Sequence, residues 1–330
     1  MNTELIINNI LQPPILFFFL GLLAVYFKST FEMPPPLPRF FSYYLLFSIG
    51  FKGGEELRHS GFNLEVMYAL LAAIFIATLI PFYTFFILKK KVGLYNAGAI
   101  AATYGSVSAV TFITTASFLS SIKLHFGGHM VAAMAMMESP AIIIGVYLTR
   151  KYLQKEGGHA GQIVPKFSRW QTTKEALLDG SVFLLLGSLL IGMISSEKQA
   201  HTITPFTESI FKGMLCFFLL EMGLQAGKRM KEIFQSGFLL VGFAIIAPVI
   251  NAFIGISFAY LIGLSVGNAL ILSVLAASAS YIAVPAAMRI AIPEASPGIY
   301  IPMALAITFP FNIVVGIPLY YQIIVKVWEM

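Results

Sequence analysis

The sequence predicts an all-α membrane protein of ten transmembrane helices, arranged as two inverted five-helix repeats in which helices four and nine are broken where they cross. Three observations predict this fold. Hydrophobic residues make up 58% of the 330 residues and charged residues only 11%, against roughly 25% charged in a soluble domain. Ten apolar segments follow one another along the chain. Two of these segments carry hydroxyl-rich interruptions at matching places in the two halves.

Each predicted span is an apolar run bounded by polar residues, in the range that can cross a bilayer as a tilted or interrupted helix. We expect the second span to end at the glycine-rich stretch 50–54. The runs cover residues 13–27, 40–54, 64–88, 94–119 and 130–148, and then 175–194, 207–227, 237–261, 266–288 and 300–325. We therefore predict a first repeat over residues 1–150, a cytoplasmic linker over 151–174 and a second repeat over 175–330.

The repeat is predicted from small and polar residues that recur in the same order in both halves. Because five is an odd number of spans, the second half enters the membrane from the opposite side, which makes the repeat inverted. Chance similarity between apolar segments is the alternative. The matched pairs are Gly50 with Gly223, Gly54 with Gly227, Asn96 with Asn268, Ser106 with Ser278, Ser108 with Ser280 and Pro140 with Pro310.

The distribution of basic residues predicts the orientation in the plasma (inner) membrane. Of the 21 Lys and Arg residues, 6 fall on the side that carries both termini and 15 on the other side. Basic residues collect in cytoplasmic loops. The central loop is therefore predicted to be cytoplasmic and both termini external. The basic residues lack interleaved aromatic residues, so no nucleic-acid partner is expected, and membrane lipid is the expected surroundings.

The two interruptions are predicted to form a binding site for a small solute. A helix break frees backbone groups that must find partners inside the membrane. We expect strained dihedral angles at Gly105 and half-helix N-termini that point at one spot, where a small anion would be stabilised. No Arg or Lys lies near either break in the sequence. The predicted substrate ligands are Gly105, Ser106, Val107, Ser108, Ser278, Ala279, Ser280 and Tyr281.

Oxygen atoms near the breaks are also predicted to bind a cation. The residues are Thr111, Glu138, Ser108 and Ser280, because hydroxyl and carboxylate oxygens suit a hard cation such as Na⁺. A carboxylate within an apolar segment is a functional candidate by default. Glu221 is either functional or a hydrogen-bond partner between helices. The five histidines are expected at the surface. The single cysteine, Cys216, excludes an internal disulfide, and no cofactor or further metal is expected.

The alternative for the serines and glycines is that they only let helices pack closely. An intramembrane enzyme with Ser106 or Ser280 as nucleophile is disfavoured, since no His or Lys lies in these segments to act as a base. A carrier of another small solute, a channel and a non-transporting sensor remain open.

With these residues in view, the chain resembles the sodium-dependent bicarbonate transporters of cyanobacterial inorganic-carbon uptake. The resemblance implies a secondary active symporter of bicarbonate and Na⁺ with core and gate domains. It also implies a site at the crossing of helices four and nine, elevator-like movement, a homotrimer and, in some members, a PII-like cytoplasmic regulator. It rests on Gly50-x3-Gly54, on Gly105 to Ser108, on Ser139-Pro140, and on Ala276 to Ser280 with Pro285, Arg289, residues 292–295 and Pro297.

The chain departs from the family pattern at both clusters. The family reads Ser-Ser-Ser-Asp after the second break, whereas this chain has Tyr281 in the place of the acid. After the first break, Ala109 and Val110 replace a Gly-Ser pair. The resemblance implies Na⁺ as the coupling ion, and these departures leave H⁺ as an alternative.

Overall fold

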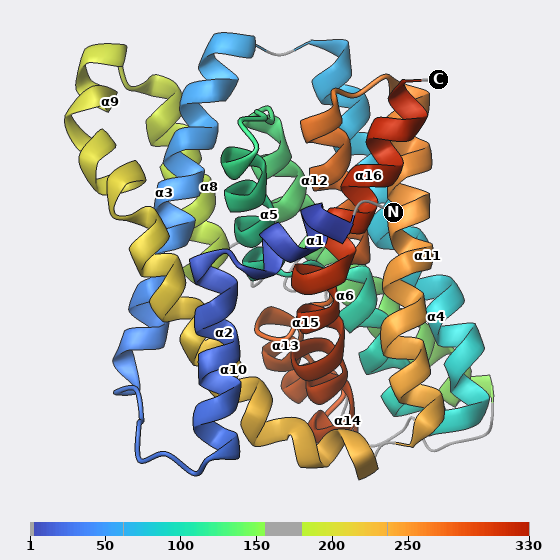
Figure 1. Cartoon of the computed structure of the whole chain (residues 1–330). Coiled ribbons are helices and arrows are strands. Elements are labelled where there is room, and N and C mark those ends of the chain that lie inside the picture. The colour runs from blue at the N-terminus through green and yellow to red at the C-terminus, as the bar shows by residue number, and fades with distance from the viewer. Residues whose placement is uncertain (1–2, 62, 156–179, 236, 330) are drawn as a thin grey trace.

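The computed structural model describes residues 3–61, 63–155, 180–235 and 237–329. Within these residues all regular structure is helical and no strand occurs, so the predicted all-α class is confirmed. The helices run back and forth between two ends of the molecule (Figure 1). The carboxy-terminal end of the chain lies at the same end of the molecule as the turn between α3 and α4.

In the first half the helices are α1 (Thr3–Ile10), α2 (Pro13–Tyr26), α3 (Pro36–Ser60), α4 (Leu64–Gly105), α5 (Ala109–Ser121) and α6 (His129–Lys155). In the second half they are α8 (Gly180–Ile194), α9 (Glu197–Thr204), α10 (Phe211–Gln235), α11 (Phe238–Ile262), α12 (Val266–Ala277), α13 (Ala283–Ala291), α14 (Pro297–Pro302), α15 (Phe309–Phe311) and α16 (Ile317–Trp328). Short π-helical turns, Pro205–Ser209, Met303–Thr308 and Asn312–Gly316, precede α10 and join the last three helices.

Length and composition mark four helical stretches in the described residues as able to cross a membrane. A fifth is added if Glu197–Ser209 and Phe211–Met230, which are bent by 40° at their junction, form one span. The apolar helices α2, α8 and α12 have 14, 15 and 12 residues, fewer than the roughly 20 that cross a bilayer unaided. A membrane protein is thus supported, and the count of ten spans stays a prediction. The four stretches are Leu64–Ser121, His129–Lys155, Phe238–Ile262 and Pro297–Trp328.

The long helix α4 contains the boundary predicted between spans three and four. Gly93 has φ +79° and ψ 166°, which interrupts the helical backbone. The left-handed φ favours glycine because a Cβ would clash there. A second glycine with left-handed φ, Gly263 (φ +78°), ends α11 before α12 begins.

The prediction that the second span ends at residues 50–54 is wrong, because α3 continues as a helix to Ser60. The glycines serve packing instead. A Cβ at Gly50 would lie 2.6 Å from the carbonyl oxygen of Leu185, and one at Gly54 would overlap the carbonyl of Leu189. Small residues let two backbones approach closely inside a membrane. The same residues that look like a helix end in the sequence therefore bring α3 against α8.

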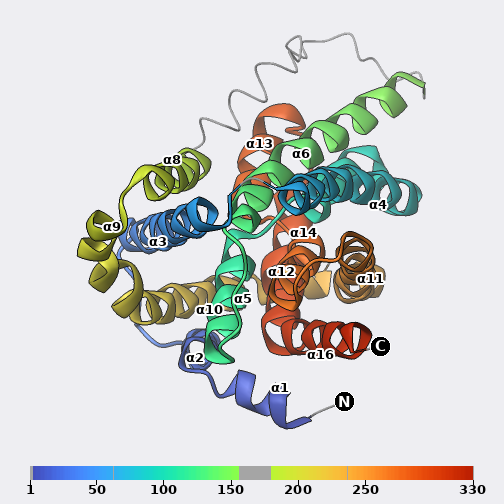
Figure 2. The same cartoon turned by 90° about the horizontal axis from the view of Figure 1, so that it is seen from above.

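A second close helix pair is built in the same way. A Cβ at Gly223 of α10 would overlap the carbonyl oxygen of Phe18, and one at Gly21 of α2 would overlap that of Leu220. The four helices α2, α3, α8 and α10 lie together on one side of the molecule, and we call them the panel (Figure 2). The helices α4, α6 and α11 to α16 lie on the other side, and we call them the bundle; α5 reaches from the bundle toward the panel.

We expect Gly54→Ala to lower the thermal unfolding temperature of the detergent-solubilised protein, because its methyl group meets the α8 backbone. Overpacking of this kind costs about 1–3 kcal/mol. Gly187→Ala on α8 is the matched control, since no heavy atom lies within 4 Å of its added Cβ. Equal unfolding temperatures for the two variants would contradict the packing role of Gly54.

The amino-terminal helix α1 is attached to the bundle through a buried side chain. The Nδ2 of Asn9, which is 3% exposed, donates a hydrogen bond of 2.7 Å to the carbonyl oxygen of Ile313. In a π-helix that carbonyl would accept from the N–H five residues later, but residue 318 is a proline and has none. Asn9 therefore supplies a hydrogen bond to a carbonyl that cannot accept one from residue 318.

Candidate functional site

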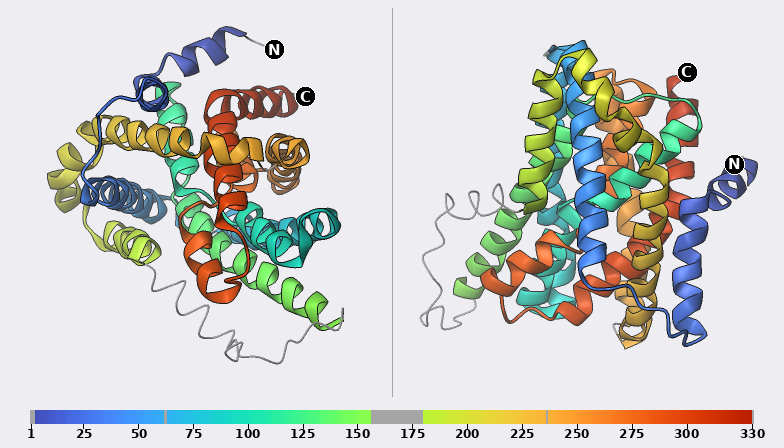
Figure 3. Two further views of the ribbon diagram at one scale, coloured as in Figure 1. Left: turned by 90° about the horizontal axis from the view of Figure 1, so that it is seen from below. Right: turned by 90° about the vertical axis from the view of Figure 1, so that its left-hand side faces the viewer.

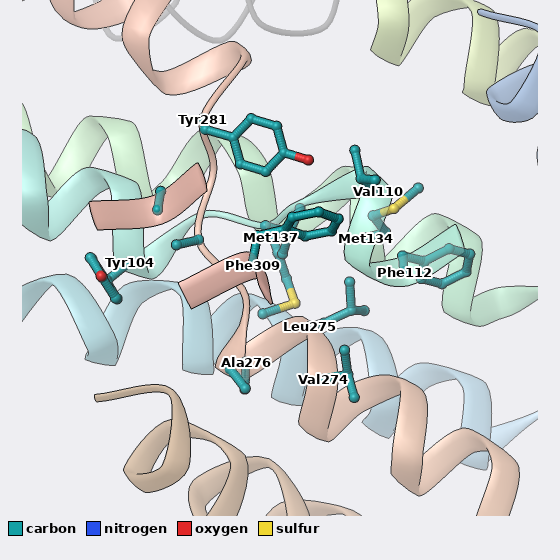
Figure 4. Close-up of a cluster of buried hydrophobic side chains, with 14 of the residues drawn as sticks. Tyr104, Val110, Phe112, Met134, Met137, Val274, Leu275, Ala276, Tyr281 and Phe309 are labelled. Carbon is teal, nitrogen blue, oxygen red and sulfur yellow. The ribbon is translucent and has the colours of Figure 1, made fainter. Parts of the chain in front are cut away.

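Two helix interruptions lie in the middle of the molecule. Residues 106–108 separate α4 from α5, and residues 278–282 separate α12 from α13. The two segments pass across each other in Figure 4. Both interruptions stand where the hydroxyl clusters of the sequence predict them.

Direct hydrogen bonds join the two interruptions. The backbone N–H of Ser108 donates to the Oγ of Ser278 at 2.9 Å. The backbone N–H of Ser280 donates to the carbonyl oxygen of Thr103 at 2.9 Å. Backbone groups freed by a break are costly inside a membrane unless they are paired. Each interruption thus satisfies part of the backbone of the other, and this fixes the crossing.

Two serine side chains begin the helices that leave the crossing. Ser108 Oγ accepts from the backbone N–H of Thr111 at 3.2 Å, as the N-cap of α5. Ser280 Oγ accepts from the backbone N–H of Val284 at 3.3 Å, in the first turn of α13. Serine is a favoured residue at helix starts because its oxygen pairs with an otherwise free N–H. The positive ends of two helix dipoles therefore face the crossing.

Besides the hydroxyl of Tyr281, three more hydroxyls at the crossing are buried and have no hydrogen-bond partner among the described residues. They belong to Thr103, Ser106 and Thr111, whose exposed fractions are 0%, 0% and 1%. A buried polar group without a partner calls for a specific explanation, such as a bound ion or water. These three oxygens, which we call the inner face of the crossing, are candidate ligands for such an ion or water.

A cavity of about 510 Å³ opens beside the crossing, between the panel and the bundle. Of the predicted site residues, Val107, Ser108, Ser280, Tyr281 and Glu138 line it, whereas Gly105, Ser106, Ser278, Ala279 and Thr111 do not. Figure 4 shows the hydroxyl group of Tyr281 directed toward Val110 and Met134, which also line the cavity. From the panel, α3 contributes Arg39, Ser42, Tyr43 and Leu46, α8 contributes Ser181, Val182 and Leu185, and α10 contributes Phe218 and Met222.

Comparison with known protein families decides what kind of protein this is. The family model of the Na⁺-dependent bicarbonate transporter superfamily matches residues 13–325, which include both interruptions and every residue that lines the cavity. The chain belongs to this superfamily. The resemblance found in the sequence is thereby confirmed, and the family is one of transporters and not of enzymes. A comparison with curated proteins finds no match.

Within this member of the bicarbonate transporter superfamily, the strained dihedral angles expected at Gly105 are not found. Its φ is not in the left-handed region, and the residue is simply the last of α4. A Cβ at Gly105 would overlap Pro81 and would lie 3.1 Å from the Cβ of Ala141. The glycine is required because α4 folds back on itself and against α6 at this point. No strain at the break is needed to explain it.

One basic residue that is distant from both breaks in the sequence lies beside the cavity. Arg39, from the start of α3, lines the cavity next to the crossing. It is more than 60 residues from the nearer break in the sequence, and only the packing of the panel on the bundle brings it there. Sequence reasoning missed it for that reason.

Three other buried polar residues of this superfamily member have hydrogen-bond partners. Glu221 accepts a hydrogen bond of 2.8 Å from Gln225 of its own helix, and not one from another helix. Asn312 Nδ2 donates to the carbonyl oxygen of Ala277 at 2.9 Å, at the end of α12. The Oδ1 of Asn251 accepts from the hydroxyl of Tyr83. The surface position expected for His129 is wrong, since its side chain is buried at the start of α6.

Proposed function

We propose that the protein is a secondary active transporter that carries bicarbonate together with Na⁺ across the plasma (inner) membrane, with the substrate bound at the crossing of the two helix interruptions. The observation that carries this proposal is the crossing itself. Two helix N-termini and a set of buried hydroxyls meet beside a cavity between two groups of helices. Superfamily membership supports the substrate and the coupling ion.

The proposed anion site is the cavity face of the crossing. Ser108, Ser280 and Tyr281 present hydroxyl groups there, and the N-termini of α5 and α13 add partial positive charge. Arg39 adds a full positive charge at the cavity wall. This combination suits a small, singly charged oxyanion. Val107, which lines the cavity, and Ala279 and Ser278, which do not, contribute backbone and packing to the same site.

The proposed cation site lies on the inner face of the crossing. The unpartnered hydroxyls of Thr103, Ser106 and Thr111 supply oxygen atoms, and none of these three residues lines the cavity that Arg39 lines. Hard cations prefer such oxygen ligands. Glu138, on the cavity side, would balance the charge of Na⁺, or carry a proton if H⁺ is the coupling ion. The two ions would then sit on opposite sides of one backbone crossing.

Alternating access around this crossing is supported by contacts that recur in the two halves. Asn96 Oδ1 accepts from the backbone N–H of Ser296 at 2.8 Å, ahead of α14. Its predicted counterpart Asn268 accepts through Oδ1 from the backbone N–H of Gly127 at 2.6 Å, ahead of α6. The two close pairs of the panel, α2 with α10 and α3 with α8, follow the same pattern (Figure 3). These pairs support an inverted repeat of ten spans.

Further parts of the proposal rest on the sequence and on the family. The central loop is proposed to be cytoplasmic and both termini external. A homotrimer and a PII-like regulator on the cytoplasmic face follow from the resemblance. Most of the linker 151–174 lies outside the described residues.

Uptake of radiolabelled bicarbonate by purified protein in lipid vesicles tests the proposal. We expect saturable uptake that is faster with an inward Na⁺ gradient than with choline. A pH gradient across the same vesicles tests H⁺ as the coupling ion, and a series of other small anions tests alternative substrates. Linear, non-saturating flux would show a channel. No flux of any anion under any gradient would overturn the carrier and favour a membrane sensor.

A further inference from the structure

A second cavity, of about 610 Å³, lies between the panel and α5. Its walls come from α3, from the end of α5, from the loop 122–128 and from the start of α10. The two cavities lie along the same helix, because residues 38–46 of α3 line the first and residues 48–56 line the second. The second cavity shares no lining residue with the first.

The floor of the second cavity is polar. Ser48, Ser117 and Thr207 line it and are 1%, 9% and 6% exposed. Ser48 donates to the carbonyl oxygen of Tyr44 at 2.9 Å and Thr207 to that of Ile203 at 3.3 Å. These two hydroxyls are therefore satisfied within their own helices, and Ser117 is the one of the three whose proton is left for a ligand.

The rim of the cavity is basic. Lys52, Lys123 and Lys212 line it together with two acids, Glu56 and Glu208. Lys52 is already neutralised, since its Nζ lies 2.8 Å from the carboxylate of Glu208. Among the described residues, Lys123 and Lys212 form no ion pair. One acid, Glu56, therefore stands against two lysines, and the cavity carries an excess of positive charge.

We propose that this second cavity is a capture site for the transported oxyanion, in which Lys123 and Lys212 attract it and the hydroxyl of Ser117 donates a hydrogen bond to it. The inference rests on the proposed function for the identity of the anion. A cavity with one sign of excess charge and low-dielectric walls concentrates oppositely charged solutes. The anion would meet this site at the end of α5, whereas the first cavity is lined by the start of that helix.

The kinetic test uses the double variant Lys123→Gln/Lys212→Gln in vesicles, with bicarbonate as the probe. At low ionic strength we expect the apparent KM for bicarbonate to rise about tenfold, the low end of electrostatic steering, while the maximal rate changes far less. High ionic strength should remove most of the difference, because salt screens exposed charges. Lys123→Arg/Lys212→Arg should restore the KM. Lys326→Gln is the control, since this exposed lysine of α16 lies outside both cavities.

A second measurement does not depend on transport. Acylation of individual lysines of the purified protein is followed by mass spectrometry in bicarbonate and in gluconate of equal ionic strength. We expect bicarbonate to protect Lys123 and Lys212 relative to Lys326. Carbamate formation from dissolved CO₂ would slow the acylation of Lys326 to the same extent. The acylation of Lys123 and Lys212 relative to that of Lys326 therefore reports bicarbonate binding.

The outcomes separate the capture site from the proposed function. If bicarbonate does not protect the two lysines from acylation, the capture site is overturned. It is also overturned if the wild type transports bicarbonate and the double glutamine variant has the same KM. Protection of both lysines in a protein that moves no bicarbonate would support the capture site and overturn the carrier.

Discussion

Replacement of Ser108 and Ser280 together by alanine is expected to abolish bicarbonate uptake while the protein stays folded. Both hydroxyls line the cavity, and both accept a backbone N–H at the start of a half-helix. Their loss removes two hydroxyl ligands of the proposed anion site and frees two N–H groups next to it. The lost cap of Ser108 costs about 1 kcal/mol and the lost hydrogen bond of Ser280 about as much, which a protein with roughly 5–15 kcal/mol of stability tolerates.

The control for this variant is Ser196→Ala. Ser196 is also an N-cap serine, since its Oγ accepts from the backbone N–H of Gln199 at the start of α9, but it is exposed and lines neither cavity. We expect Ser196→Ala to keep full uptake at a similar cost in stability. Size-exclusion profiles and unfolding temperatures check folding, and vesicle uptake checks function. Near-normal uptake by the folded double variant would remove the anion site from the crossing.

The interruptions could be predicted from the sequence because their signal is local. Hydroxyl clusters around residues 106–108 and 278–280 stand out in apolar runs, and their matching positions in the two halves mark them as a pair. The all-helical class follows from composition in the same way. What each residue does at a break was harder to predict. Ser106 and Ser108 are two positions apart, yet only Ser108 lines the cavity, because an irregular segment does not follow a fixed side-chain period.

The features that sequence reasoning missed come from contacts between distant helices. Arg39 and the lysines of the second cavity reach their places only through the packing of the panel. At Gly54 a feature was assigned wrongly and not missed. The glycine-rich stretch around it resembles a helix end in the sequence, but in the structure it allows a close contact with α8. Local sequence patterns identify stretches of small residues. Whether such a stretch ends a helix or lets it pack closely against another depends on the neighbouring helix.

Replacement of Glu138 by glutamine is expected to remove the dependence of uptake on the coupling cation. Glu138 is the one acidic side chain that lines the cavity beside the crossing, within the part of the chain that the structure describes. A neutral amide keeps the size of the side chain but cannot balance the charge of Na⁺ or release a proton. We expect the rate at saturating bicarbonate to fall at least about tenfold, equivalent to 1.4 kcal/mol, and the remaining rate to be the same in Na⁺ and in choline.

Glu221→Gln is the matched control, because it makes the same chemical change at a buried carboxylate that lines neither cavity. Glu221 already pairs with Gln225 within α10, and a glutamine at position 221 can accept that hydrogen bond. Its Na⁺ response should therefore match the wild type. Measured over a range of Na⁺ concentrations and pH values, an unchanged cation response in Glu138→Gln would make Glu138 structural. The cation would then have to be held by the hydroxyls of Thr103, Ser106 and Thr111, whose combined replacement by valine and alanine would be the next variant to lose coupling.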